Sequence, residues 1–381
     1  MSIALEDIPE SEVYVKLIHK CKHDRTEVTL NTRMLSAEQR SVLHQYCTSL
    51  KLSTYSEKVS SGDGKLIVVT PIEKPIDQYK SIKLFVKNTK VPIANIDPDN
   101  IDYYIDALDP YYNCKELWST YQREMRDTGR DPLLNLQNIS NAACKAITSH
   151  PEIAELKRKI EDKELVFRTD KNTKETTYRG HNAGKHFVSF DMIKANFSSL
   201  KLYCPTLFPG SWVDFIGQFT DSETVKMIKL NRETIIGLSK LSKTVRKIME
   251  HIVHDLYLFM REQIPELGDR VYKCCDELIF ETNVKLSGHS LAEFREKINH
   301  TLSKFPKAYL FRTEYFHLKQ MQDTKYYYKL HHNGTILPRG VPKNYMMHFI
   351  KKLEGKDVNE LDLTALDGEG VPYVYKKSVF D

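Results

Sequence analysis

The sequence lacks the features that mark several common classes of protein. Its seven cysteines form neither a CxxC pair nor a zinc-binding spacing, so we expect reduced thiols. No apolar run reaches the roughly 18 residues that a membrane-spanning helix needs, and the acidic segment 1–12 has no signal-peptide pattern. The motifs of serine hydrolases, dinucleotide-binding enzymes and ligases are also missing. We therefore expect an intracellular protein, with cytoplasmic, nuclear and viral settings all open, and no membrane partner.

The composition is that of a globular protein with a small excess of positive charge. A chain of 381 residues that is 41% hydrophobic is long enough for two or three domains with real cores. Glycine and proline number 15 each, and there is no repeat, which excludes fibrous and disordered classes. The 56 Lys and Arg residues against 51 Asp and Glu leave a net charge of +5, which permits a nucleic-acid partner without requiring one.

The apolar pattern predicts an α+β protein. We expect strands at 13–19, 27–31, 64–71 and 79–90, a helix capped by Ser36, a proline-punctuated acidic loop at 92–110, and helices at 114–127 and 136–163. Composition shifts then divide the chain into four regions. These are an N-terminal α+β accessory region (1–110), a helical connecting region (111–165), a main domain (166–345), and a C-terminal helix with an acidic tail (346–381).

Acidic residues interrupt two apolar strands of the main domain. One predicted strand ends in Asp191, and another, 271–280, has Asp276 and Glu277 at its middle, where a hairpin bend would place them. A carboxylate in a buried strand is unfavourable unless something compensates its charge. Mg²⁺ or Mn²⁺ provides such compensation, because these ions prefer oxygen ligands. If the strands are neighbours, Asp191 and Asp276 would hold two metal ions about 4 Å apart.

Basic residues accompany these acids. Between the two acidic strands we expect a basic helix around 232–247, with Lys243 and Lys247 on one face and Lys240 one turn earlier. Further basic residues precede the first acidic strand or follow the second, where tyrosines separate two of the lysines. The full set is Arg232, Lys240, Lys243, Arg246, Lys247, Arg168, Arg179, Lys185, Lys325 and Lys329. Such residues favour binding of phosphates and of a nucleic-acid backbone.

The order of these elements resembles the palm of template-dependent nucleic-acid polymerases: a strand ending in Asp191, a basic helix, then a hairpin bearing Asp276 and Glu277. The triplet Cys275-Asp276-Glu277 is similar to the His-Asp-Glu of family A DNA polymerases. The segment 325–329, with the glycines and lysine that follow it up to residue 343, is similar to the primer-gripping hairpin of family B. The helix signature of family A is absent, and Asn196 stands where that family has Glu, so the polymerase family stays open.

The resemblance implies an α+β palm, an antiparallel sheet with helices, preceded by an accessory and fingers-like region and followed by a short thumb. It implies templated nucleotidyl transfer with Mg²⁺ or Mn²⁺, and as partners a template and primer, nucleoside triphosphates, and viral or DNA-replication proteins. Asp191 and Asp276 would bind the metals, and Glu277 would support Asp276 or the primer end. The basic helix would bind the triphosphate, Asn196 or Phe197 would exclude a 2′ hydroxyl, and the other basic residues would hold nucleic acid.

Other interpretations of the same residues remain open. An acid at a strand end is often only a turn residue or a helix cap, so the protein is alternatively a non-catalytic nucleic-acid-binding or virion-associated protein on a palm-like scaffold. A cyclase-type nucleotidyltransferase would share the two acids but would have a closed pocket. The segment 180–185 is not a Walker loop, because no Ser or Thr follows its lysine and it precedes a strand.

Overall fold

The structure, a computed structural model, describes residues 4–24, 28–32, 34–50, 52–58, 65–70, 77–168, 176–284, 288–322, 324–366 and 372–374. The chain divides into two compact units, residues 1–77 with 125–131, and residues 78–124 with 132–381. The N-terminal segment of the first unit thus ends at Asp77 and not near residue 110, and residues 125–131 return to that unit. Helix α4 (Ile101–Tyr112) runs through the boundary that we expected there, within the segment 92–110 that we predicted to be a loop.

The first unit packs two helices against a small antiparallel sheet with strand order β1-β3-β2. Its elements are η1 (Leu5–Asp7), α1 (Ser11–Asp24), β1 (Val28–Leu30), α2 (Ala37–Ser49), β2 (Ser53–Lys58) and β3 (Lys65–Thr70). The predicted strand 13–19 is wrong: it lies in α1, whose buried residues Tyr14, Ile18 and Cys21 recur at helical spacing. The predicted cap of α2 is confirmed, because the Gln39 amide donates to Ser36 Oγ at 3.2 Å.

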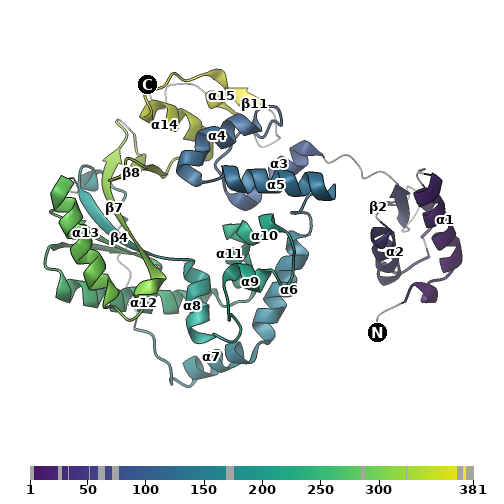
Figure 1. The fold of residues 1–381 in the computed structure, drawn as a ribbon, viewed down its shortest axis with the longest axis horizontal. Coiled ribbons are helices and arrows are strands. Elements are labelled where there is room, and N and C mark those ends of the chain that lie inside the picture. Colours follow the sequence, from purple (N-terminus) through teal and green to yellow (C-terminus); the bar gives the residue numbers. More distant parts are fainter. Residues whose placement is uncertain are drawn as a thin grey trace. The chain divides into compact units, whose positions relative to one another are not determined.

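The second unit contains most of the helices and one larger sheet (Figure 1). The predicted strand 79–90 is wrong, because helix α3 occupies 78–89 and buries Ile82 and Phe85 on one side. The predicted helical segment 136–163 is two helices, since Pro151 starts α7 and the Glu152 amide donates to His150 Nδ1. The helices of this unit are α3 (Gln78–Thr89), α4, α5 (Lys115–Thr128), α6 (Leu136–Ser149), α7 (Pro151–Glu161), η2 (Gly180–Asn182), α8 (Ala195–Tyr203), α9 (Trp212–Ile216), α10 (Glu223–Met227), α11 (Lys229–Leu238), α12 (Ser242–Gln263), α13 (Gly288–Ser303), η3 (Ala308–Leu310), η4 (Lys343–Tyr345), α14 (Met346–Leu353) and α15 (Glu360–Leu363).

The larger sheet is antiparallel throughout, with strand order β5-β6-β4-β7-β8-β9. Its strands are β4 (His186–Met192), β5 (Leu267–Lys273), β6 (Glu277–Thr282), β7 (Phe311–Gln320), β8 (Tyr327–His331) and β9 (Ile336–Arg339). The strand ending at Asp191 is therefore confirmed as β4. The acidic strand 271–280 is a hairpin, β5 and β6, with Asp276 in its turn. A separate two-stranded sheet joins β10 (Thr364–Leu366) to β11 (Pro372–Val374).

The two faces of this sheet differ because successive side chains of a strand point to opposite sides. One face, which we call the covered face, carries Val188 and Phe190 of β4 and Phe280 of β6, all fully buried. These residues belong to one core with apolar residues of α8, α12 and α13, and Figure 1 shows α12 and α13 along β4 and β7. The opposite face, which we call the polar face, carries Ser189 and Asp191 toward the end of β4, beside a smaller buried cluster that includes Phe187, Ile279 and Phe316.

The C-terminal elements are hydrogen-bonded to α4. Tyr103 donates its hydroxyl to Asp362 at 2.5 Å, and Tyr104 donates to the Leu361 carbonyl at 2.9 Å. Tyr111 donates to Glu354 at 2.8 Å. Burial, followed by these acidic partners, raises the pKa of Tyr103 to about 12 and also raises the pKa of Tyr111.

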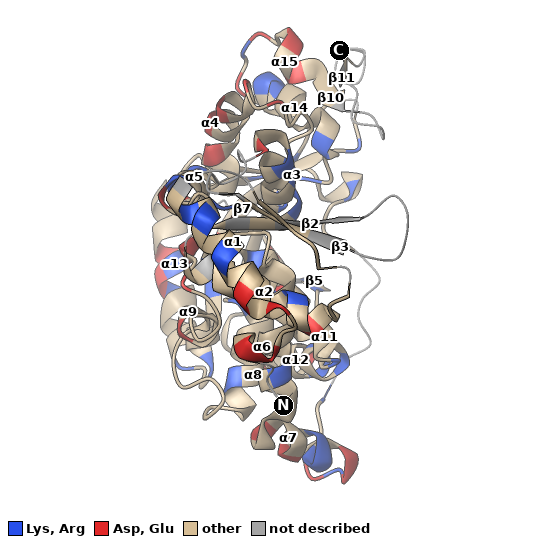
Figure 2. Cartoon of the chain, turned by 90° about the vertical axis from the view of Figure 1, so that its right-hand side faces the viewer, with Lys and Arg blue, Asp and Glu red and all other residues tan. Residues whose placement is uncertain are grey.

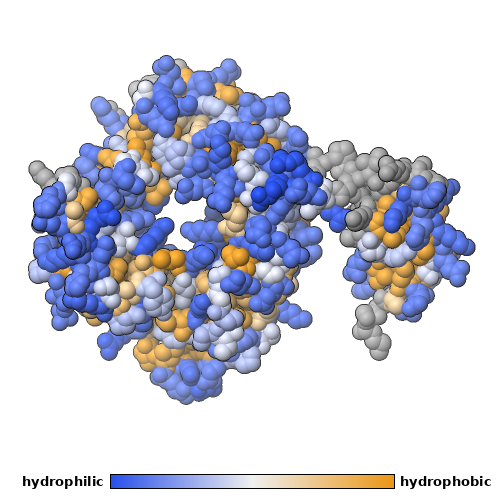
Figure 3. Space-filling model, viewed as in Figure 1, coloured by the Kyte–Doolittle hydropathy of each residue, from blue (hydrophilic) through white to orange (hydrophobic). Residues whose placement is uncertain are grey.

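The surface of the second unit is mostly hydrophilic on the face shown in Figure 3, with apolar residues in small groups. Within the described ranges, no helix combines the length and apolar character needed to cross a membrane. Charges of both signs alternate on α7, as Figure 2 shows, and there Arg158 pairs with Glu155, Asp162 and Glu164. Such exposed pairs contribute little to stability.

Candidate active site

The two predicted metal-binding residues come from strand β4 and from the turn that precedes its neighbour β6. Strand β4 pairs with β6 so that Asp191 lies opposite Glu277, and the Met192 amide donates to the Asp276 carbonyl at 2.9 Å. The hairpin turn is closed by the Cys274 amide, which donates to the Glu277 carbonyl at 2.8 Å. This register brings the end of β4 beside the turn that carries Asp276. The predicted neighbourhood of the two strands is therefore confirmed.

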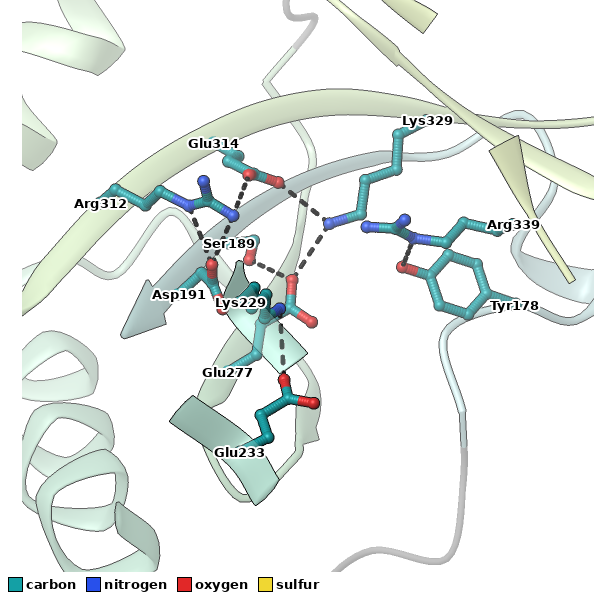
Figure 4. Close-up of polar contacts among 10 residues, drawn as sticks. All are labelled: Tyr178, Ser189, Asp191, Lys229, Glu233, Glu277, Arg312, Glu314, Lys329 and Arg339. Atoms are coloured by element: carbon teal, nitrogen blue, oxygen red, sulfur yellow. Dashed lines mark hydrogen bonds and ion pairs between the residues drawn. The ribbon is translucent and has the colours of Figure 1, made fainter. Parts of the chain in front are cut away.

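Asp191 has a close basic partner that the sequence analysis missed. Arg312 lies opposite Asp191 on β7. Its Nε donates to Asp191 Oδ2 at 2.8 Å, and its Nη2 lies 2.6 Å from the same oxygen and 3.4 Å from Glu314 Oε1 (Figure 4). The Arg312 side chain is 62% exposed and that of Asp191 only 23%. The carboxylate is thus held by a cation that is itself largely exposed to solvent.

Glu277 belongs to a more deeply buried part of the same network. Ser189 donates to Glu277 Oε1 at 2.6 Å, and Lys329 Nζ lies 3.1 Å from that oxygen and 3.0 Å from Glu314 (Figure 4). Lys329 is only 1% exposed. We predicted that Lys329 would contact nucleic acid, which is wrong, because its ammonium group is enclosed between two carboxylates of the sheet. Next to it, Arg339 Nε donates to the Tyr178 hydroxyl at 3.1 Å.

Burial sets the protonation behaviour of these groups. It raises the pKa of Asp191, and although Arg312 opposes this, Glu277 and Asp276 add to the rise. Burial and the charge of Glu277 likewise raise the pKa of Asp276. Burial acts to lower the pKa of Lys329, but Tyr178 and its two carboxylate partners outweigh this, so the pKa is raised and Lys329 stays charged. The two aspartates are therefore short of positive charge, whereas the buried lysine is fully paired.

A pocket of about 260 Å³ connects the two aspartates with basic residues of α11. The chain enters it after β4 through Lys194, whose left-handed backbone (φ 49°) turns the strand into α8. The lining residues come from β4 and the turn after it, the start of α8, α11, the β5–β6 turn and β7. They are Asp191, Met192, Ile193, Lys194, Ala195, Asn196, Lys229, Arg232, Glu233, Asp276 and Arg312.

The predicted basic helix is divided in two. Helix α11 ends at Leu238, Lys240 adopts a left-handed conformation (φ 58°), and α12 starts at Ser242. Lys240 therefore does not precede Lys243 and Lys247 on one helix, and that part of the prediction is wrong. Of the predicted basic set only Arg232 lines the pocket; Lys240, Lys243, Arg246 and Lys247 are exposed and do not line it, and Arg246 pairs with Glu250 at 2.8 Å.

The two predicted sugar-gate residues have different environments. Asn196 lines the pocket, whereas Phe197 is 5% exposed and packs against Phe208 and Trp212 in the core. Phe197 faces away from the pocket side of α8 because consecutive helical residues point in different directions. A contact between Phe197 and a bound nucleotide is therefore excluded in this conformation, and Asn196 is the remaining candidate.

The other predicted nucleic-acid contacts lie outside the pocket. Arg168, Arg179 and Lys325 are exposed, and none of them lines the pocket. Lys185 pairs with Glu281 at 3.0 Å on the polar face. The structure thus leaves these four residues as untested predictions at the surface of the unit.

Lys229 and Glu233 are further pocket residues that the sequence analysis did not select. They lie one turn apart on α11, 3.8 Å from each other, and Glu233 also pairs with Lys90 at 3.2 Å. The spacing i,i+4 across a predicted basic helix was the available signal. Arg312 gave no such signal, because its place beside Asp191 depends on strand register.

The donor set suits a metal ion that shares its ligands with a substrate. Among the residues that the structure describes, no group of three or more His, Cys, Asp and Glu side chains is arranged to hold an ion alone. Mg²⁺ commonly uses one or two carboxylates and completes its shell with water and substrate phosphates. Asp191 and Asp276 could provide the two carboxylates of such a shared site.

The comparisons with known proteins identify no relative. No family model, no curated protein and no solved structure matches this chain.

Proposed function

We propose that this protein is a template-dependent nucleic-acid polymerase that transfers nucleotides by a two-metal mechanism. One observation carries the proposal: Asp191 of β4 and Asp276 of the turn before the neighbouring strand β6 line a single pocket together with Lys229 and Arg232. Paired carboxylates beside cations suit metal-assisted transfer of a nucleotidyl group, because the acids would bind divalent ions and the cations would bind phosphates.

The carboxylates hold the reacting groups in place. When bound, divalent ions would supply positive charge for the phosphate oxygens and for the primer 3′ oxygen. Asp191 and Asp276 would bind and orient these ions, and their raised pKa values express the shortage of positive charge at this point. Glu277 does not line the pocket, so we assign it a supporting role, in which Ser189 and Lys329 fix its position behind Asp191.

The triphosphate would lie against α11. Arg232 Nε is buried and has no hydrogen-bond partner among the described residues, and burial lowers the pKa of this guanidinium group. A phosphate oxygen would satisfy that donor and supply the missing counter-charge. Lys229, whose ion pair with Glu233 is long, is a second phosphate donor at the same wall.

The nucleic acid would approach along α3. This helix carries Lys80, Lys83 and Lys87 and no acidic residue, in contrast to the mixed charges on α7 in Figure 2. The three lysines are exposed and lie opposite the buried side of the helix. Lys90, just beyond its end, pairs with Glu233 of the pocket lining. A stripe of single-sign charge that ends at the pocket suits a phosphate backbone.

The decisive experiment is primer extension by the full-length protein on labelled DNA and RNA templates with Mg²⁺ or Mn²⁺. We expect Asp276→Asn to reduce incorporation more than 100-fold, since even outer partners of a metal contribute about 10–100-fold. Asp106→Asn, an exposed acid of α4 paired with Lys115, is the matched control and should retain wild-type activity. Equal incorporation by Asp276→Asn and wild type would overturn the proposal.

The alternative, a non-catalytic nucleic-acid-binding or virion-associated protein, is favoured by the ion pairs of the acids. Asp191 and Glu277 each have a basic partner within the sheet, as purely structural acids would. Binding of a labelled primer–template without incorporation in any of these reactions, unchanged by Asp276→Asn, would select this function.

A further inference from the structure

The contacts of Arg312 conflict with the metal-binding role of Asp191. Both Nε and Nη2 of Arg312 approach the same oxygen, Asp191 Oδ2, at 2.8 and 2.6 Å. A divalent ion needs lone pairs of that carboxylate and repels a guanidinium group at this distance. A divalent ion therefore competes with Arg312 for Oδ2, and an ion bound at the other oxygen of Asp191 is still repelled by the guanidinium group.

We propose that Arg312 is an internal counter-ion that competes with the divalent metal for Asp191 and moves to Glu314 when the metal binds. This inference rests on the proposed function, because it assumes that Asp191 is a metal ligand. In the absence of metal, the guanidinium group offsets part of the effect by which burial raises the pKa of this carboxyl group. In its presence, the ion takes over that charge and Arg312 is released.

The geometry supports such an exchange at Arg312 but not at Lys329, the cation that pairs with Glu277 and Glu314. The Arg312 side chain is 62% exposed, so it leaves Asp191 without opening the core. Its second partner is already in place, because Nη2 lies 3.4 Å from Glu314 Oε1. Lys329, by contrast, is 1% exposed and forms ion pairs with both Glu277 and Glu314. Lys329 is thus the fixed charge of the polar face and Arg312 the movable one.

The solvent exposure of the Arg312 side chain determines how strongly it should weaken metal binding. Exposed ion pairs are worth little, and a cation that water can replace is displaced easily. Removing Arg312 should therefore tighten metal binding by about threefold to tenfold, which corresponds to the upper range of such pairs plus the loss of one repelling charge. The same change should make the metal-free protein less stable, because Asp191 and Glu314 then face each other with one counter-ion fewer.

The test is a titration of the full-length protein with Mn²⁺ alone, followed by its paramagnetic resonance signal, with no nucleotide or nucleic acid present. Arg312→Ala should bind Mn²⁺ about threefold to tenfold more tightly than wild type, yet melt at a lower temperature in EDTA. Arg312→Lys, which keeps the charge, should bind Mn²⁺ nearly as the wild type does. Arg295→Ala, which changes a half-buried arginine of α13 next to Tyr315 and His332, is the control and should leave the Mn²⁺ affinity unchanged.

A purely structural role of Arg312 would not make Arg312→Ala bind Mn²⁺ more tightly while lowering the melting temperature. Arg312→Ala with unchanged or weaker Mn²⁺ affinity and a cooperative melting transition would overturn the inference. If Arg312→Ala does not fold, Arg312→Gln, which preserves the length of the side chain, gives the same comparison. Asp191→Asn separates the two proposals. If this variant binds Mn²⁺ as tightly as the wild type, the metal site itself is contradicted. If Asp191→Asn abolishes Mn²⁺ binding but substitution of Arg312 has no effect on it, only the competition is contradicted.

Discussion

The two faces of the larger sheet are built from the same strands but hold them in different ways. On the covered face, Phe190 and Phe280 are fully buried in the core and have no charge to compensate. On the polar face, the alternate residues Asp191 and Glu277 depend on two cations from β7 and β8. Burial stabilises the first face through apolar area alone. The second face retains unfavourable electrostatics, which proteins usually keep where they bind charged ligands.

The largest change in stability is expected at residues that are almost fully buried, one on each face. Lys329→Met should lower the free energy of unfolding by about 3–5 kcal/mol, because it leaves the carboxylates of Glu277 and Glu314 without their buried counter-ion. Phe280→Ala, the matched change on the covered face, should have an effect of similar size through the cavity it creates. Urea unfolding of the three proteins, monitored by circular dichroism, measures both changes.

Compensating substitutions distinguish the two faces. Replacing the acids together with the lysine, as Lys329→Met with Glu277→Gln and Glu314→Gln, should recover part of the loss, because no charge is then left uncompensated. A triple variant that is no more stable than Lys329→Met would show that Lys329 acts by packing and not by charge.

A smaller effect of opposite sign is expected at the pocket. Because burial raises the folded-state pKa of Asp276 above its unfolded value, its ionised form destabilises the folded protein at neutral pH. Asp276→Asn should therefore raise the melting temperature in EDTA by about 1–3 °C at pH 7.5. The gain should appear as the pH rises through and above about 3.9, the ordinary pKa of aspartate, and should be absent below it, where both states are protonated. A lower melting temperature for the variant at pH 7.5 would contradict this.

The smallest effect concerns the charge on α3. Replacing Lys80, Lys83 and Lys87 by Gln should reduce the salt dependence of single-strand binding by about 2 in the slope of log K against log salt, since each phosphate contact contributes roughly 0.7. Fluorescence anisotropy with a labelled oligonucleotide at several salt concentrations measures it. The same three substitutions at Lys16, Lys20 and Lys22 of α1 should leave the slope unchanged, and equal slopes for wild type and the α3 variant would exclude that helix as a nucleic-acid surface.

Local sequence was enough to predict the elements that carry strong patterns. The apolar run before Asp191 and the acid pair within 271–280 predicted β4 and the β5–β6 hairpin, because an acid between apolar residues requires a strand end or a turn. The segments 13–19 and 79–90 were misread as strands. In both, β-branched and aromatic residues gave a strand-like composition, although the buried residues recur at intervals of three and four.

Strand register explains what the sequence could not predict of the site. Asp191 and Asp276 were selected as one site, and they do line one pocket, because each is marked by its own apolar context. Arg312 was missed and Lys329 misplaced, since the side of the sheet on which each lies depends on pairings of β7 with β4 and β8. A shift of one residue in either pairing would exchange the faces. Long-range pairings of this kind leave no signal in a single sequence.

The bonds between α4 and the C-terminal elements have a consequence for synthesis of the chain. The partners of Tyr103, Tyr104 and Tyr111 lie 259, 257 and 243 residues further along the sequence. At translation rates of about 5–20 residues per second, α4 leaves the ribosome roughly 12–50 s before those partners exist. During that interval its apolar and tyrosine-rich surface lacks its native cover, so nascent chains stalled before residue 354 should bind chaperones through α4, and completed chains should not.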